Sequence, residues 1–140
     1  MSWLLDTCVL SEYVGKQPAP AVIHWLDEQE EARLFVSVIS LGEIEKGILK
    51  LRPVDARRAQ KLRFWFGHLE RRFAARTLAI DSRIMRTWAQ ISASAEAEGR
   101  KLPLMDGLLM ATAQCHEFTI VTRNVRDFDR YPDVFNPWVA

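Results

Sequence analysis

Four acidic residues occupy positions that a parallel β-sheet would bring together at one edge. They are Asp6, Glu43, Asp106 and Asp127. The carboxyl ends of parallel strands and the amino ends of the returning helices share that edge, where open α/β sheets bind their ligands. Carboxylates held together there repel one another, by about 4 kcal/mol per pair at 4 Å in a medium of dielectric 20. A cation relieves this repulsion, and ligands that are all oxygens favour magnesium or manganese.

Each acid also has an ordinary structural explanation. Asp6 follows an apolar run and could cap the next helix, while Ser40 and Glu43 fit a capping box after a β-rich run. Asp106 opens a predicted helix, where the helix dipole favours a negative charge. Asp127 follows the strand-like run into which that helix leads, and it could stabilise a turn. Four unrelated caps have no reason to fall at one edge of one sheet, so a shared site remains the alternative to four local roles.

Small polar residues lie beside the acids in the sequence. They are Thr7, Ser40, Thr122 and Asn124. Such side chains can orient carboxylates or hold a water molecule next to them. They can equally well cap the local backbone, and the sequence favours neither role.

The composition is that of a soluble globular chain that forms one domain over residues 1–140. Hydrophobic residues make up 49% and charged residues 26%, and no apolar stretch approaches the ~20 residues of a membrane helix. The amino terminus lacks the basic region of a signal peptide, so we expect a cytoplasmic protein without membrane association. Cys8 and Cys115 have no metal-ligand spacing, which predicts buried, reduced thiols.

Charge is distributed unevenly along the chain. Residues 50–76 contain nine basic and two acidic residues, a net charge of +7, so the remaining chain carries −6 within a total of +1. A basic segment beside an acidic pocket suits a polymer of phosphates whose hydrolysis needs a metal ion. The alternative is a solvated helix face with no ligand.

Strand-like runs alternate with helical ones, which is the pattern of an α/β fold. The predicted strands are residues 3–5, 34–38, 77–80, 119–122 and 134–135. The predicted helices are residues 18–26, a helix whose inner face carries residues 44, 48 and 51, residues 55–76, residues 82–99 and residues 103–116. No linker or internal repeat interrupts this order.

Four short motifs carry a resemblance to a known family. They are Leu4–Thr7 with Val9–Ser11, Ser37–Glu43, Pro103–Gly107 with Ala111–Ala113, and Thr122–Phe128. In this order and spacing they resemble PIN-domain ribonucleases, and most of all the VapC-type toxins of bacterial toxin–antitoxin pairs. One departure is Cys8, where many relatives have asparagine.

The resemblance implies a three-layer α/β/α PIN-like fold with a mostly parallel sheet, and a magnesium-dependent endoribonuclease, with manganese as an alternative ion. It makes Asp6, Glu43, Asp106 and Asp127 both the metal ligands and the catalytic residues. A carboxylate-held metal can lower the pKa of water, polarise a phosphoryl oxygen and steady the leaving oxygen. The implied partners are RNA as substrate, a second copy in a homodimer, a cognate antitoxin, and operator DNA through the antitoxin complex only.

Two other classes of function stay open at this point. One is a non-catalytic nucleic-acid-binding or regulatory partner with the same fold, although retention of all four acids argues against it. The other is a metal-dependent phosphatase of small molecules, which the +7 segment makes less suitable. A cleavage assay with and without magnesium distinguishes the first, and a comparison of RNA with a small phosphate ester distinguishes the second.

Overall fold

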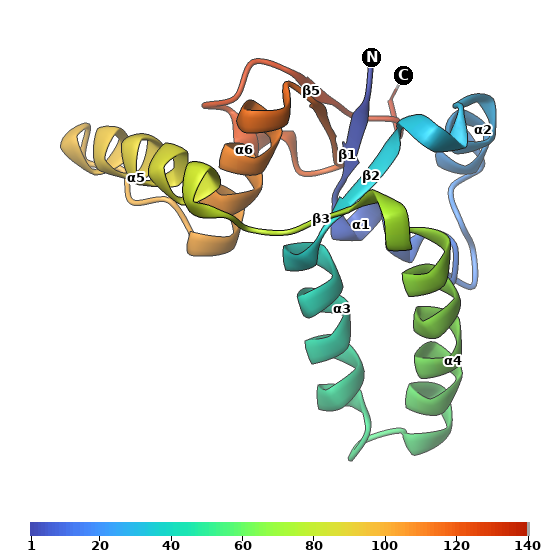
Figure 1. Cartoon of the computed structure of the whole chain (residues 1–140). Helices are drawn as coiled ribbons and strands as arrows, with labels where there is room; N and C mark the ends of the chain where they lie inside the picture. The colour runs from blue at the N-terminus through green and yellow to red at the C-terminus, as the bar shows by residue number, and fades with distance from the viewer. Residues whose placement is uncertain (140) are drawn as a thin grey trace.

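Five short parallel strands form one sheet in the order β3-β2-β1-β4-β5 in the computed structural model, which describes residues 1–139 (Figure 1). The strands are β1 Trp3–Leu5, β2 Leu34–Ser37, β3 Thr77–Leu78, β4 Thr119–Val121 and β5 Val134–Phe135. Every neighbouring pair is parallel. All five predicted strands are therefore present, three of them one or two residues shorter than expected.

Helices cover both faces of this sheet. They are α1 Thr7–Ser11, α2 Pro20–Glu28, α3 Val38–Leu51, α4 Ala56–Arg72, α5 Ser82–Ala97 and α6 Leu104–His116, with short 3₁₀ helices η1 Glu31–Arg33, η2 Ala74–Arg76 and η3 Val125–Phe128. The predicted three-layer α/β/α fold is confirmed. Among residues 1–139, no helix combines the length and the apolar character needed to cross a membrane.

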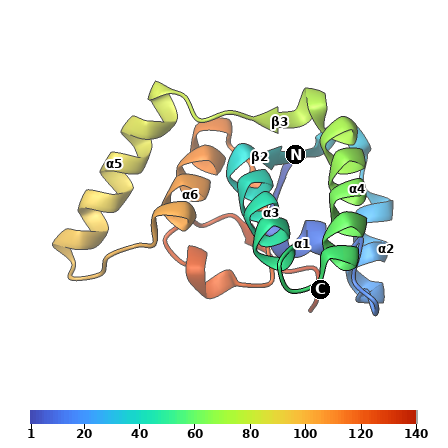
Figure 2. The same cartoon turned by 90° about the horizontal axis from the view of Figure 1, so that it is seen from below.

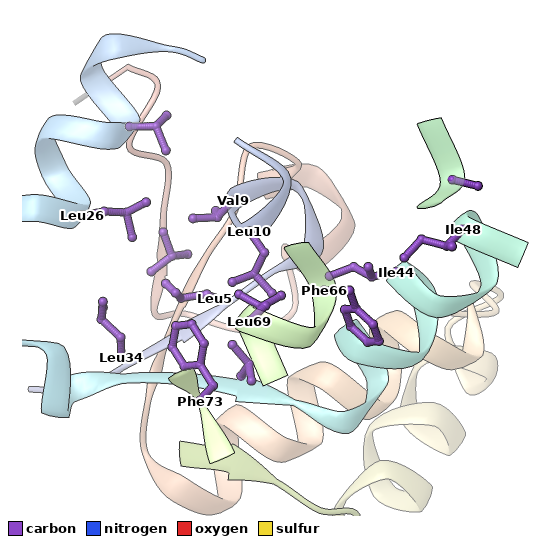
Figure 3. Close-up of a cluster of buried hydrophobic side chains, with 14 residues drawn as sticks. Leu5, Val9, Leu10, Leu26, Leu34, Ile44, Ile48, Phe66, Leu69 and Phe73 are labelled. Atoms are coloured by element: carbon purple, nitrogen blue, oxygen red, sulfur yellow. The ribbon is translucent and has the colours of Figure 1, made fainter. Parts of the chain in front are cut away.

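Side-chain alternation along the strands divides the interior into two cores. Leu5 and Val121 point into a core formed with helices α1 to α4, and Figure 3 shows its buried side chains. Leu4 and Ile120, each one residue earlier, point into a second core under α5 and α6. Both leucines are fully buried, and burying such a side chain stabilises the fold by about 1.5–3 kcal/mol. The sheet edge that carries Asp6 is therefore held from both faces.

Polar side chains cap the amino ends of four helices, and the cap of α1 is Asp6. Ser37 Oγ accepts a hydrogen bond from the Ile39 N–H at 3.0 Å and caps α3. Asp55 and Asp81 cap α4 and α5 in the same manner. The predicted capping box at Ser40 is wrong, because β2 ends at Ser37 and the helix already includes Ser40.

The predicted helix over residues 55–76 is shorter than expected. α4 ends at Arg72, and the chain continues through η2 into β3. The Arg76 guanidinium donates to the carbonyl oxygens of Glu31 and Leu34, both at 2.7 Å, which ties this turn to the start of β2. Arg72 and Arg76 also form ion pairs with Glu31. Arg72 and Arg76, two of the basic residues in the segment 50–76, therefore stabilise the fold.

Helices α3 and α4 pack against each other and extend away from the carboxyl edge of the sheet (Figures 1 and 2). On the other side of the molecule, α5 packs on α6. The edge that carries the predicted acids thus lies between the start of α3 and the start of α6.

Candidate active site

All four predicted acids line one pocket of about 370 Å³ at the carboxyl edge of the sheet. The lining residues are Asp6, Thr7, Cys8, Glu43, Met105, Asp106, Leu109, Asn124 and Asp127. Asp6 follows β1, Glu43 lies on α3, Asp106 lies in the first turn of α6, and Asp127 lies on η3. The structure thus brings together acids that are up to 121 positions apart in the sequence.

Asp6 is the most firmly held of the four acids. Its side chain is 9% exposed. Its Oδ1 accepts a hydrogen bond from the Thr7 N–H and its Oδ2 accepts one from the Thr122 hydroxyl, both at 2.8 Å. Burial raises the pKa of the Asp6 carboxyl, while the hydrogen bonds from Thr122 and Thr7 act in the opposite direction. Asp6 is therefore both the cap of α1 and a fixed wall of the pocket.

Glu43 is exposed, and it approaches the pocket from α3. Its Oε1 accepts a hydrogen bond from the Thr7 hydroxyl at 3.1 Å. Thr7 thus connects the carboxylates of Asp6 and Glu43, through its backbone N–H and its hydroxyl respectively. Glu45, two residues further along α3, instead forms an ion pair with Arg63 on α4.

The pKa of Asp106 reflects both its burial and the negative charges of the other acids in the pocket. Burial, followed by the negative charges of Asp127, Asp6 and Glu43, raises the pKa of the Asp106 carboxyl to about 6. This happens although the first turn of α6 is a favourable place for an anion. The unfavourable charge of its neighbours is the kind of interaction that a bound cation reverses.

The donor set of the pocket fits a hard cation. The four acids offer only oxygen ligands, which suit magnesium and manganese. Among residues 1–139, no three Asp, Glu, His or Cys side chains stand close enough to form a ready-made metal group. Glu43 and Asp127 are exposed and Asp106 is half-buried, so these three can turn toward a shared ion by side-chain rotation.

The four predicted polar neighbours have different outcomes. Thr7 and Thr122 each donate a hydroxyl hydrogen bond to one of the acids. Asn124 lines the pocket, and its N–H donates to Thr122 Oγ1 at 3.0 Å. Ser40 is not at the pocket: it is fully buried on the inner face of α3, where its Oγ has no hydrogen-bond partner among the described residues. It shares that face with Ile44, one turn further along.

Cys8 belongs to the pocket wall, a role that the sequence alone does not assign. Its Sγ lies 3.6 Å from Thr122 Oγ1 and 3.9 Å from Asp6 Oδ2, and it accepts a weak hydrogen bond from the Arg123 N–H at 3.5 Å. Burial raises the pKa of this thiol. Both cysteines are free and half-buried, where the sequence predicts full burial. The departure from asparagine noted for Cys8 was the available signal.

Fold and pocket together define an α/β domain with an acidic site at the carboxyl edge of a parallel sheet. The PIN domain family model matches residues 3–134. The chain is 32% identical to VapC ribonuclease Y4jK of Sinorhizobium fredii, over 96% of each chain. It is 33% identical to Toxin FitB of Neisseria gonorrhoeae, over 96% of this chain and 97% of FitB. FitAB bound to an IR36 DNA fragment has a chain with a TM-score of 0.87 and 32% identity, covering 97% of this chain and 95% of that one.

The chain therefore belongs to the PIN-domain family, in its group of VapC-type toxins. The resemblance noted in the sequence motifs is confirmed at the level of the whole domain.

Proposed function

We propose that this chain is a metal-dependent endoribonuclease that acts as the toxin of a toxin–antitoxin pair. The observation that carries the proposal is the convergence of Asp6, Glu43, Asp106 and Asp127 in one pocket, where burial and then the other three acids raise the pKa of Asp106. Relatives in the same family are named ribonucleases or toxins. Retention of all four acids in one pocket disfavours a non-catalytic binding partner of the same fold.

In this proposal Asp6, Glu43, Asp106 and Asp127 hold the metal ion, magnesium or in its place manganese. When bound, such an ion supplies Lewis-acid activation of a phosphodiester and lowers the pKa of water. The chain fixes the geometry around it: Thr122 and the Thr7 N–H hold Asp6 in one orientation. The apolar side chains of Met105 and Leu109 also line the pocket.

RNA is a better substrate for this site than a small phosphate ester. Three of the nine basic residues in the segment 50–76 form ion pairs, namely Arg63, Arg72 and Arg76. The others form no ion pair within residues 1–139, so they remain available to a polyanion. An RNA substrate and an antitoxin made in the same cell place the activity in the cytoplasm.

An apolar groove of about 470 Å³ adjoins the acidic pocket and suits a protein partner. It lies between α1, α3 and α4, is lined by Ile48, Leu62 and Trp65, and shares Thr7 and Glu43 with the pocket. We propose that a cognate antitoxin fills this groove and places a cationic side chain against the carboxylates. Trp25, on the amphipathic helix α2, packs on Trp3 and Phe135, with ring centroids 5.0 and 5.2 Å apart, respectively.

The assembly we propose is a homodimer bound to its antitoxin, which reaches operator DNA only as that complex. FitAB, which includes a similar chain, was solved bound to DNA. The family resemblance supports the same arrangement here.

The toxin role predicts that expression of this chain alone arrests bacterial growth, because a free ribonuclease degrades cellular RNA. Co-expression of the protein encoded by the adjacent gene should restore growth, and that protein should co-purify with the chain. The control is the Asp106→Asn variant, which should be harmless when expressed alone. Harmless expression of an active, folded nuclease would contradict the toxin role and leave the ribonuclease role intact.

A further inference from the structure

A second groove leaves the acidic pocket along α3 and shares Glu43 and Gly47 with the apolar groove. It has a volume of about 510 Å³ and is lined by Val38, Gly42, Lys46, Gly47, Lys50 and Met105, together with Glu43. Glu43 and Met105 also line the acidic pocket, so the two hollows are continuous. A chain-like ligand leaving the acids therefore meets this groove directly.

Two unpaired lysines follow Glu43 along the groove. Lys46 and Lys50 are three and seven positions beyond Glu43, which places all three on one side of the helix. The two lysines are about 6 Å apart along the helix axis, a spacing suited to successive phosphates of an extended strand. Both are exposed, and neither forms an ion pair within residues 1–139. Their charges thus remain free for an anionic ligand next to the proposed cleavage site.

Two glycines, Gly42 and Gly47, expose the backbone of α3 to this groove. Gly42 and Gly47 lie in the interior of α3, where glycine is less stable than alanine. A Cβ atom added at either position would meet nothing within 4 Å. Packing and backbone conformation therefore give no reason for glycine here, because neither residue has a positive φ. A ligand that lies against the helix backbone would supply a reason.

Apolar side chains complete the wall of this groove. Val38 is 40% exposed and Met105 is 47% exposed, one at the start of α3 and the other at the start of α6. Unstacked bases can pack between apolar side chains. Cations, bare backbone and an apolar wall are thus combined in one channel that leads to the acids.

We propose that this groove holds the RNA strand on one side of the scissile bond, with Lys46 and Lys50 bound to successive phosphates. Gly42 and Gly47 let the strand approach the backbone of α3 closely. The proposal rests on the ribonuclease function and adds the path of its substrate. Free cations favour RNA over a protein partner here, and the apolar groove at Trp65 is left to the antitoxin.

Binding of labelled single-stranded RNA to the Asp106→Asn protein tests the two lysines, because this background should not cut the probe. Adding Lys46→Gln and Lys50→Gln should weaken binding about tenfold at low salt. It should also reduce the slope of log affinity against log salt by about 1.4, since each phosphate contact in a single strand contributes about 0.7. The matched control is Lys16→Gln with Lys101→Gln, two exposed lysines that lie outside this groove and outside the basic segment 50–76. It removes the same charge and should change affinity less than twofold.

Gly42→Ala tests the close approach of the strand, because Gly42 lines this groove and is not part of the apolar one. The variant should change stability and RNA binding in opposite directions. The melting temperature should rise by about 2 °C, because alanine favours the helix, while RNA affinity should fall severalfold because the new Cβ enters the groove. Gly67→Ala on α4 is the control, where an added Cβ makes only an ordinary 3.5 Å contact with Arg71. It should raise the melting temperature and leave RNA affinity unchanged. Unchanged RNA affinity in Gly42→Ala would overturn the close approach of the strand.

The outcomes separate this inference from the proposed function. If the Asp106→Asn protein binds RNA but the two lysine pairs behave alike, the groove proposal is overturned and the ribonuclease proposal stands. If that protein binds no RNA, both fail. Sedimentation velocity of the same variants completes the test. A changed assembly state with unchanged RNA affinity would assign the groove to protein contact and overturn it as an RNA path.

Discussion

Asp106→Asn should reduce RNA cleavage by about 10²- to 10³-fold, the size of effect expected when one charge-stabilising group of an active site is removed. The protein should nevertheless stay folded and become more stable without metal. Asp106 makes no hydrogen bond that caps α6, whose cap residue is Pro103, and its carboxylate is opposed by three other acids. Asparagine keeps the shape of the side chain and removes that repulsion. A variant that unfolds would instead show that Asp106 has a structural role.

The stability gain should depend on pH in a defined direction. The pKa of Asp106 is about 6 in the folded protein against 3.8 for the free group. Ionisation of Asp106 therefore destabilises the folded protein. This destabilisation is complete above about pH 6, decreases as the pH falls from 6 to 3.8, and is absent below 3.8. The full shift corresponds to about 3 kcal/mol, and solvent screening of a half-buried group reduces the gain to about 1 kcal/mol. Urea unfolding with EDTA at pH 8 and at pH 4 checks this: the variant should be more stable only at pH 8.

Glu43→Gln and Glu45→Gln should differ sharply although they make the same chemical change two residues apart on α3. Glu43→Gln should lower cleavage by about 10²-fold, because it removes a carboxylate from the pocket. Glu45→Gln breaks only a partly exposed ion pair with Arg63, a contact worth about 0–1 kcal/mol, and should leave cleavage within about twofold. The measurement is the single-turnover rate on one RNA with magnesium. Equal losses in the two variants would contradict the proposed role of Glu43.

The positions of the acids could be predicted because they depend on the ends of short apolar strands. Leu4 and Leu5 are both fully buried, each in a different core, so the polar residue that follows must lie at the sheet edge. The alternation of strands and helices then gives a parallel sheet, and parallel strands share that edge. This reasoning is sufficient to predict the positions of Asp6 and Asp127. Asp106 also needed the correct start of α6, which Pro103 marks.

The features that could not be predicted depend on which neighbouring helix, core or pocket a side chain faces. Ser40 and Glu43 differ by three positions, yet Ser40 faces the core and Glu43 faces the pocket, because the helix begins at Val38 and not after Ser40. Trp25 and Trp65 both lie on amphipathic helices, but Trp65 borders the apolar groove whereas Trp25 packs on Trp3 and Phe135. The groove at Lys46 and Lys50 forms only because α3 packs beside the start of α6. No short-range sequence pattern predicts that packing.

Metal dependence of RNA cleavage by the purified, antitoxin-free chain is the most direct test of the central claim. The same single-stranded RNA is incubated with magnesium, with manganese, and with excess EDTA, and the Asp106→Asn variant is run beside each reaction. Because the acidic pocket offers only oxygen ligands, cleavage should occur with either ion, stop in EDTA, return when magnesium is restored, and be lost in the variant. Undiminished cleavage in excess EDTA, or full activity of Asp106→Asn, would contradict a carboxylate-held metal as the basis of the activity.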